Sequence, residues 1–331
     1  MTAILELTDV TKNFVKHLDA AAKLARYLGA KVTEEVVHAV DGVSLKIAKG
    51  EVVGLVGESG CGKSTLGRMV AGILEPTAGA IHYKGNLVSA MDKDAGHKTA
   101  LAIQMIFQDP FASLNPRMRV QDIIGEAPVR HGIVAKAGAA DYVAEVMRRV
   151  GLDPDYRRRY PHQFSGGQRQ RIGIARALAV NPEFLVCDEA IAALDVSIQA
   201  QVINLFMDLR EDLDLTYLFI SHDLSVVEHI SDRVVIMYLG RVVEMASTED
   251  IFASPNHPYT QALLNEVPRL DIRGLDYQPI SGEIPSPLDP PPGCHFHPRC
   301  PHATARCREE RPKLREIAPG RIAACHLNDS P

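Results

Sequence analysis

The chain has 331 residues, 46% of them hydrophobic and 23% charged, and carries a formal net charge of −5 at pH 7. This composition is typical of a soluble globular protein with one large core and a smaller appended unit, and no apolar run approaches the ~20 residues that span a bilayer. The negative charge argues against nucleic acid as a main partner. Glu6 comes early and no basic segment precedes a long apolar run, so we expect no secretion signal and a reducing cytoplasm.

The first 56 residues alternate short β-rich runs with turns, as at Ile4–Leu7 and Val43–Ile47. This pattern predicts an antiparallel β layer at the start of the fold. Between the two runs, residues 16–36 carry apolar side chains at helical spacing from Leu18 to Leu28. We expect an amphipathic packing helix there, and the pattern assigns it no further role.

A phosphate-binding loop follows a predicted buried strand at residues 51–56 and precedes a helix predicted over Leu66–Leu74. Its glycines allow the backbone to curl so that N–H groups and the helix N-terminus face phosphate oxygens. Lys63 can reach the β- and γ-phosphates, and Ser64 can ligate Mg²⁺. The complete motif between a strand and a helix favours a binding site for a nucleoside triphosphate over a plain glycine-rich turn. The residues expected to contact the nucleotide are Gly57, Glu58, Ser59, Gly60, Cys61, Gly62, Lys63, Ser64 and Thr65.

Residues of about 110–180 are predicted to be mostly helical, most clearly at Tyr142–Met147, and to form a helical subdomain. Short apolar runs at 184–187, 217–220 and 233–237 are typical of strands buried in a parallel sheet. The sequence therefore predicts an α/β core. The basic run at 157–159 is expected to be a solvated helix end.

Two adjacent carboxylates, Asp188 and Glu189, end the apolar run at 185–187. Charges at the end of a buried strand are costly unless they face a metal or water. Asp188 would hold Mg²⁺, directly or through water, and Glu189 would orient and polarise the water that attacks the γ-phosphate. A second glycine-rich motif, Phe164–Gln170, opens a further helix.

The phosphate loop, the carboxylate pair and the motif at 164–170 together resemble an ABC-transporter ATPase, specifically of the oligopeptide/dipeptide importer branch. In that family the 164–170 motif is the signature, and it faces the γ-phosphate held by another subunit. The resemblance implies that Ser165, Gly166, Gly167 and Gln168 form this signature and that its hydroxyl, amides and helix dipole act in trans. It therefore implies that catalysis requires a dimer.

Further segments carry the same resemblance. Gln108 lies in a segment similar to the Q-loop, where the glutamine meets Mg²⁺ or the lytic water and couples to the membrane subunits. His222 matches the switch histidine that contacts the γ-phosphate, and Asp195 matches the D-loop across the dimer. Phe14 lies where the family stacks an aromatic ring on adenine, and residues 256–264 also resemble the peptide branch. The catalytic candidates are thus Glu189, His222 and Gln108, and the Mg²⁺ candidates are Ser64, Gln108 and Asp188.

One segment departs from the family pattern. Residues 190–194 read Ala-Ile-Ala-Ala-Leu where the family usually has Pro-Thr-Ser-Ala-Leu. Losing the proline and two hydroxyls can loosen or redirect the D-loop. Because Glu189 and Asp195 are retained, we expect an altered rate or coupling rather than an inactive site.

The resemblance implies a P-loop NTPase fold, with a nucleotide-binding domain at 1–255 that contains the antiparallel layer and the helical subdomain, and a Cys-rich extension at 256–331. The implied function is ATP hydrolysis that powers import of peptides or similar small solutes, on the cytoplasmic face of a prokaryotic inner membrane. The implied partners are a second ATPase subunit, identical or paralogous, two transmembrane permeases and a substrate-binding protein.

Two alternatives stay open, namely a soluble ABC ATPase outside transport and a regulatory subunit that binds ATP without turnover. The sequence does not name the solute, since peptide, nickel, opine and glutathione systems have similar ATPases.

Four cysteines, Cys294, Cys300, Cys307 and Cys325, lie near the end of the chain with gaps of five, six and seventeen residues. In a cytoplasmic protein such thiols favour a metal centre over disulfides. They lack the closely spaced pair with which zinc sites usually begin, which favours an iron–sulfur cluster. The tail also resembles the C-terminal region of peptide-importer ATPases in which four cysteines are associated with a [4Fe–4S] cluster. Zinc, with nearby histidines as substitute ligands, and four unligated thiols remain alternatives. Because the tail is far from the phosphate loop in sequence, we expect its role to be structural or docking.

Overall fold

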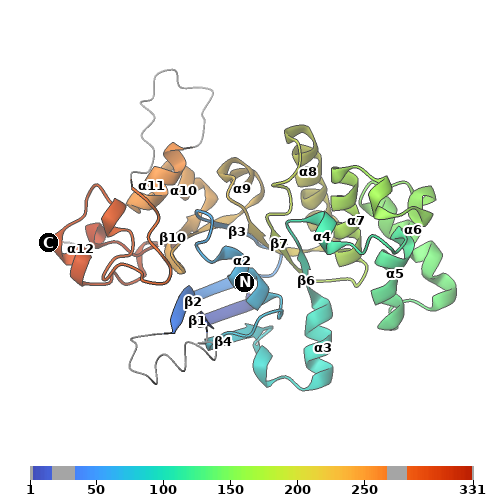
Figure 1. Cartoon of the computed structure of the whole chain (residues 1–331), viewed down its shortest axis with the longest axis horizontal. Helices are drawn as coiled ribbons and strands as arrows, with labels where there is room; N and C mark the ends of the chain where they lie inside the picture. Colours follow the sequence, from blue (N-terminus) through green and yellow to red (C-terminus); the bar gives the residue numbers. More distant parts are fainter. Residues whose placement is uncertain (1–2, 17–33, 267–281, 330–331) are drawn as a thin grey trace, which may run out of the picture.

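The computed structural model describes residues 3–16, 34–266 and 282–329. Its strands are β1 (Ala3–Lys16), β2 (Glu35–Ala48), β3 (Val52–Val56), β4 (Ala78–Tyr83), β5 (Asn86–Leu87), β6 (Ile103–Ile106), β7 (Phe184–Asp188), β8 (Thr216–Ile220), β9 (Arg233–Tyr238), β10 (Arg241–Ser247), β11 (Arg315–Ala318) and β12 (Arg321–Ala323). Over these ranges they form a four-stranded antiparallel sheet, β2-β1-β4-β5, and an eight-stranded mixed sheet, β11-β12-β10-β9-β3-β8-β7-β6 (Figure 1).

The helices surround these sheets. The α-helices are α2 (Lys63–Val70), α3 (Lys93–Ala102), α4 (Pro110–Ser113), α5 (Val120–Arg130), α6 (Ala139–Arg149), α7 (Gly166–Leu178), α8 (Val196–Leu213), α9 (Leu224–Ile230), α10 (Thr248–Ala253), α11 (Pro258–Asn265) and α12 (Ala305–Glu309). The 3₁₀ turns are η1 (Val88–Ala90), η2 (Lys136–Gly138), η3 (Pro154–Arg158), η4 (Pro161–Gln163), η5 (His297–Arg299) and η6 (His326–Asn328). No helix within the described ranges is both long and apolar enough to cross a membrane.

The centre of the large sheet is parallel and buried on both faces. β3 lies between β8 and β9. Each of the strands β3, β7 and β8 has five residues, and all of them are buried. Along β7, Leu185 and Cys187 join the hydrophobic cluster of the helical side, while Phe184 and Val186 join the cluster beneath the antiparallel sheet. This two-sided burial is the reason why the strands read as continuous apolar runs. The prediction of an α/β core is confirmed.

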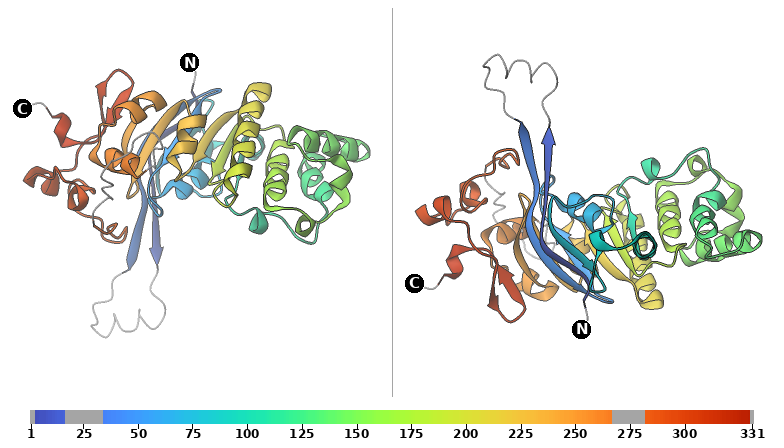
Figure 2. Two further views of the ribbon diagram at one scale, coloured as in Figure 1. Left: turned by 90° about the horizontal axis from the view of Figure 1, so that it is seen from above. Right: turned by 90° about the horizontal axis from the view of Figure 1, so that it is seen from below.

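The antiparallel sheet is larger than the sequence predicts. β1 and β2 form a long ribbon that projects from the body of the molecule (Figure 2). The prediction of a helix over 16–36 is wrong for both ends of that range. There Lys16 pairs with Glu35, and Val15 pairs with Val36, in this ribbon. The β-branched valines on facing strands favour that pairing. Residues 17–33 lie outside the described part of the chain.

The helical subdomain lies at one end of the molecule and contains α4 to α7 (Figure 1). In α6 the buried residues are Val143, Ala144, Val146 and Met147, which follow a helical period and confirm the prediction there. The basic run at 157–159 ends η3, as expected of a solvated helix end. The helix predicted over Leu66–Leu74 instead ends at Val70. Gly72 has φ +70°, a left-handed conformation that stops the helix.

The C-terminal extension continues the large sheet. β12 pairs antiparallel with β10, where Met245 lies opposite Ile322. Phe296 is 1% exposed, and its ring centroid lies 5.3 Å from those of Tyr238 and Tyr259. The division of the chain at 255/256 remains a prediction, but the sheet itself runs across it.

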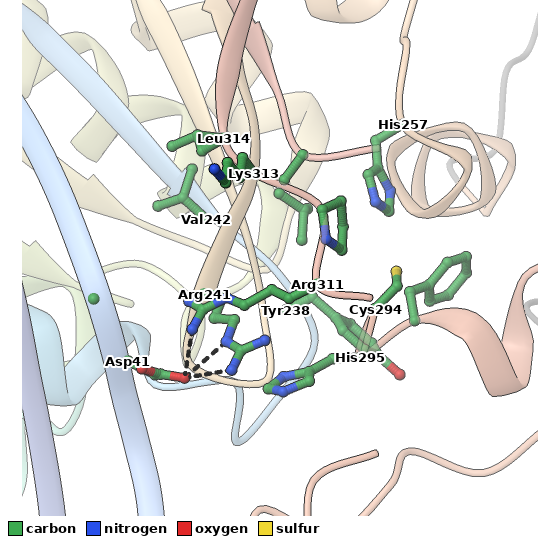
Figure 3. A pocket seen from close by; sticks show the side chains of 15 residues that line it. Asp41, Tyr238, Arg241, Val242, His257, Cys294, His295, Arg311, Lys313 and Leu314 are labelled. Atoms are coloured by element: carbon green, nitrogen blue, oxygen red, sulfur yellow. Dashed lines mark hydrogen bonds and ion pairs between the residues drawn. The ribbon is translucent and has the colours of Figure 1, made fainter. Parts of the chain in front are cut away.

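A second contact joins the extension to the antiparallel sheet. Arg241 Nε of β10 donates to Asp41 Oδ2 of β2 at 2.8 Å, and Arg311 Nη1 of the extension lies 3.7 Å from the same oxygen. These residues line a cavity of about 390 Å³ together with Cys294 and His295 (Figure 3). The ion pairs therefore connect β2, β10 and the cysteine-bearing segment.

Candidate nucleotide-binding site

The phosphate loop connects β3 to α2 and is held tightly against neighbouring backbone. Gly62, at the start of α2, has φ +104°, and a Cβ there would lie 2.1 Å from the carbonyl oxygen of Ala39. A Cβ on Gly57 would lie 2.2 Å from the carbonyl oxygen of Met237. Both contacts exclude any other residue without movement of the backbone. The strand–loop–helix arrangement predicted from the sequence is present.

Lys63 curls back over this loop. Its Nζ donates to the carbonyl oxygens of Gly57 at 2.7 Å and Glu58 at 3.0 Å, and the residue is only 4% exposed. Carbonyl oxygens satisfy the hydrogen bonds of the ammonium group but do not neutralise its charge. A phosphate group entering the loop would supply that missing negative charge.

Ser64 and Asp188 meet beneath the loop. The Ser64 hydroxyl donates to Asp188 Oδ1 at 2.7 Å. Burial raises the pKa of Asp188, while the hydrogen bond from Ser64 and the charge of Arg68 oppose this shift. A hydroxyl and a carboxylate at the carboxyl edge of a parallel sheet are a donor set that suits Mg²⁺.

Three predicted catalytic residues converge on one carboxylate. Gln108 Nε2 donates to Glu189 Oε2 at 2.7 Å, and His222 Nδ1 lies 3.4 Å from Glu189 Oε1. Glu189 also has φ +47°, a left-handed conformation that costs roughly 1–3 kcal/mol in a non-glycine residue. Its N–H donates to the carbonyl oxygen of Ile220 at 3.0 Å, which holds this conformation. The backbone and two side chains therefore fix the carboxylate.

Some of these groups line a cavity of about 370 Å³, whereas the predicted site residues Asp188 and His222 are not part of its lining. Its lining residues are Phe14, Val37, Ala39, Ser59, Gly60, Gly62, Lys63, Ser64, Thr65, Gln108, Glu189 and Pro287. Phe14 is 41% exposed in β1, so a flat face is available beside the cavity. The cavity thus joins an apolar end at Phe14 to a phosphate-binding end at Lys63, which is the layout that a nucleotide requires.

Three predicted contact residues, Gly57, Glu58 and Cys61, do not line this cavity. Cys61 is buried beside Lys63, with Sγ 3.9 Å from Nζ. The Glu58 N–H donates to the hydroxyl of Tyr259 at 2.9 Å, and its carboxylate is paired with Arg299. Glu58 therefore faces the C-terminal extension.

The four cysteines of the tail come from separate elements, and a backbone hydrogen bond joins two of them. Cys294 N–H donates to the carbonyl oxygen of Cys307 at 2.8 Å, and all four side chains are free thiols of intermediate exposure. Burial raises the pKa of Cys325 to about 11, and the charges of the other three thiols contribute in the same direction. Within the described residues, however, no three His, Cys, Asp or Glu side chains are grouped as a metal-ion site.

Comparison with known proteins identifies the family. Residues 40–192 match the family model for the ABC transporter, and residues 243–307 match the oligopeptide/dipeptide transporter C-terminal region. The chain is 51% identical over 328 residues to the oligopeptide transport ATP-binding protein AppF of Bacillus subtilis, covering 98% of this chain and 97% of that protein. The chain belongs to the ABC-transporter ATP-binding subunits of the oligopeptide/dipeptide importer family.

Other relatives agree with this assignment. The dipeptide transport ATP-binding protein DppF of Haemophilus influenzae is 49% identical over 291 residues, which are 87% of this chain and 89% of that protein. The structure of cbiO1 from Clostridium perfringens, part of the ABC transporter complex cbiONQ, has a TM-score of 0.63 at 26% identity and covers 77% of this chain and 92% of that one. The ATP-binding cassette MJ0796, in a dimeric post-hydrolysis state bound to ADP and Pi, has a TM-score of 0.62 at 27% identity. The match covers 74% of this chain and 98% of that one. The predicted fold class is confirmed, and the chain is an ATPase of this family.

In this ABC ATPase the signature motif lies apart from the nucleotide cavity of its own chain. The Ser165 hydroxyl accepts from Gln168 N–H at 3.3 Å, and Gln168 Oε1 accepts from Ser165 N–H at 3.0 Å, so the two residues cap α7 reciprocally. Gly166 and Gly167 face Leu194 and Ile198, next to Asp195 at the start of α8. None of these predicted site residues lines the cavity.

Residues 190–192, where the sequence departs from the family pattern, are packed against the core of this ABC ATPase. Ala190 and Ile191 are 2% and 3% exposed, and Ile191 O accepts from Gln199 Nε2 at 3.1 Å. This burial anchors the segment in place of the lost proline and hydroxyls. The predicted effect on rate or coupling stays a prediction.

Sequence reasoning missed Val37, Ala39 and Pro287 as lining residues. Val37 pairs with Phe14 across β1 and β2, and Pro287 reaches the cavity because its carbonyl oxygen accepts from His38 N–H at 3.1 Å. No local motif marks these positions. Only the strand register and the docking of the extension place them here.

Proposed function

We propose that this chain hydrolyses ATP to power the import of peptides or similar small solutes through a membrane ABC transporter. The observation that carries the hydrolytic part is the Glu189 carboxylate, which Gln108 and His222 hold at the edge of the phosphate-loop cavity. The peptide class is supported by the relatives, which are named oligopeptide and dipeptide transport ATP-binding proteins.

The roles of the residues follow from this geometry. Lys63 and the loop backbone bind the β- and γ-phosphates, and Phe14 stacks on the base. Ser64 and Asp188, with Gln108, would hold Mg²⁺, which offsets phosphate charge when bound. Glu189 orients the attacking water and polarises its O–H bond, and His222 contacts the γ-phosphate. Gln108 and His222 would exchange their present contact with Glu189 for contacts with Mg²⁺, water or phosphate.

The site is completed by a second ATPase subunit, whose signature residues Ser165 to Gln168 would approach the γ-phosphate. The separation of these residues from the cavity of their own chain supports this arrangement. The subunit would lie on the cytoplasmic face of the inner membrane, bound to two permeases that receive solute from a binding protein. The two alternatives, a soluble non-transport ATPase and a regulatory subunit without turnover, are less well supported, because the relatives are transport proteins and Glu189 is in place.

Coupled ATP turnover tests the proposed function. The chain is assembled with its permeases and partner ATPase, and phosphate release is measured with and without peptide-loaded binding protein. We expect the peptide-loaded binding protein to raise turnover severalfold. Turnover that is unchanged by permeases, binding protein and peptide alike would favour the non-transport alternative.

We also propose that Cys294, Cys300, Cys307 and Cys325 hold a [4Fe–4S] cluster. The backbone hydrogen bond between Cys294 and Cys307, and the mutual effect of the thiols on the pKa of Cys325, support this proposal. A single zinc ion needs every sulfur about 2.3 Å from one point. A cluster places four irons and four sulfides between its ligands, so it suits thiols that are near one another without meeting at one point.

Metal analysis distinguishes these possibilities. Protein purified without oxygen should be brown and contain about four irons per chain, as expected of a Cys₄ [4Fe–4S] centre. Replacing Cys300 with serine should lower the iron content, whereas the matched change Cys187→Ser in β7 should leave it unaltered. Colourless protein with one zinc would support the zinc alternative, and protein with neither metal would leave four unligated thiols.

A further inference from the structure

Arg299 of the C-terminal extension reaches the phosphate loop across 241 residues of sequence. Its Nη1 lies 2.7 Å from Glu58 Oε2, and its Nη2 lies 2.9 Å from Glu58 Oε1. The Arg299 side chain is 4% exposed and that of Glu58 19%. A bidentate arginine–carboxylate pair of this kind fixes both orientation and charge.

The same residue of the loop is held by a second group from the extension. Tyr259 is fully buried, and its hydroxyl accepts from Glu58 N–H at 2.9 Å. The Glu58 carbonyl oxygen in turn accepts from Lys63 Nζ at 3.0 Å. The contacts therefore run from Arg299 and Tyr259 through Glu58 to the lysine that faces the phosphates.

The extension also contacts the opposite end of the nucleotide site. Pro287 lines the cavity together with Phe14, and its carbonyl oxygen is bonded to His38 of β2. Cys294 lies in the segment between Pro287 and Arg299, and Cys300 directly follows Arg299. The cysteine-bearing tail is thus adjacent to the nucleotide site, although it is far from it in sequence.

We propose that Arg299 is a positioning residue of the phosphate loop, through which the C-terminal extension sets the affinity for ATP. Two effects act together. The arginine fixes Glu58, and hence the carbonyl oxygen that orients Lys63. It also neutralises a carboxylate of the phosphate loop that would otherwise repel the phosphates. The inference rests on the nucleotide site of the proposed function, and it assigns Arg299 no contact with the nucleotide.

A set of charge variants tests the proposal on the assembled complex, with MgATP as the probe. Arg299→Gln should raise the dissociation constant and KM for MgATP roughly tenfold, because it leaves Glu58 charged and unpaired. The rate at saturating ATP should change less than twofold. Glu58→Gln in the same background should recover most of the lost affinity, because it removes the repelling charge. Arg299→Lys should have an intermediate effect, since lysine keeps the positive charge but cannot form the bidentate hydrogen bonds of the guanidinium group.

The matched control is Arg315→Gln, which removes an ion pair with Asp329 in the same extension and should leave KM unchanged. Equal affinity in the parent and Arg299→Gln would overturn the proposal. So would a double variant as weak as Arg299→Gln, because the arginine would then act only as a packing residue. If Arg299→Gln fails to fold, Arg299→Lys decides, since the proposal predicts an intermediate loss of affinity for MgATP and affinity equal to that of the parent would overturn it. A parent complex that binds no MgATP would contradict the proposed function instead.

Discussion

Replacing Glu189 with glutamine is expected to leave ATP binding intact and to lower the rate of hydrolysis by at least about a hundredfold. Glutamine keeps the shape of the side chain and can still contact Gln108 and His222, which hold the carboxylate at 2.7 and 3.4 Å. It cannot polarise the attacking water. The measurement is phosphate release by the assembled complex, alongside the dissociation constant for MgATP.

The matched control for this variant is Glu183→Gln, which removes a partly exposed carboxylate that is paired with Lys84 and lies just before β7 in the sequence. Its turnover should equal that of the parent. If the Glu189→Gln complex hydrolyses ATP near the parent rate, Glu189 is not the residue that activates water.

Replacing Lys63 with alanine should weaken the binding of MgATP itself, by roughly ten- to hundredfold. The buried ammonium group contacts two carbonyl oxygens and the sulfur of Cys61, none of which neutralises its charge, so that charge is available to phosphates. A binding titration measures the change, and Lys84→Ala, which removes a half-exposed surface lysine, is the control. Unchanged affinity in Lys63→Ala would show that the phosphates bind elsewhere.

The parts of this site that the sequence predicts are those that local chemistry dictates. Gly62 is required because its φ is positive and Ala39 leaves no room for a Cβ. The motif at 164–170 opens a helix, as predicted, because Ser165 and Gln168 cap the first turn of α7 reciprocally. Asp188 and Glu189 end a strand that must be apolar because both of its faces are buried. In each case a short segment contains the whole reason for its conformation.

The parts that the sequence does not predict depend on contacts between distant segments. Glu58 reads as a loop residue available to phosphate, yet its carboxylate is paired with Arg299 because β12 docks on β10 and carries the extension there. The helical pattern at 16–36 gives no sign that Lys16 and Glu35 face each other in a ribbon. The left-handed backbone of Glu189 likewise depends on its bond to Ile220 in the neighbouring strand. Such features follow from sheet register and docking, which no local pattern contains.

Uptake of labelled peptide into proteoliposomes tests the central claim most directly. The vesicles contain the permeases, the partner ATPase and this subunit, with binding protein outside and MgATP inside. We predict accumulation of peptide that requires internal ATP and is lost with Glu189→Gln, while Glu183→Gln accumulates peptide as the parent does. Accumulation that is independent of ATP, or that persists unchanged with Glu189→Gln, would contradict the account.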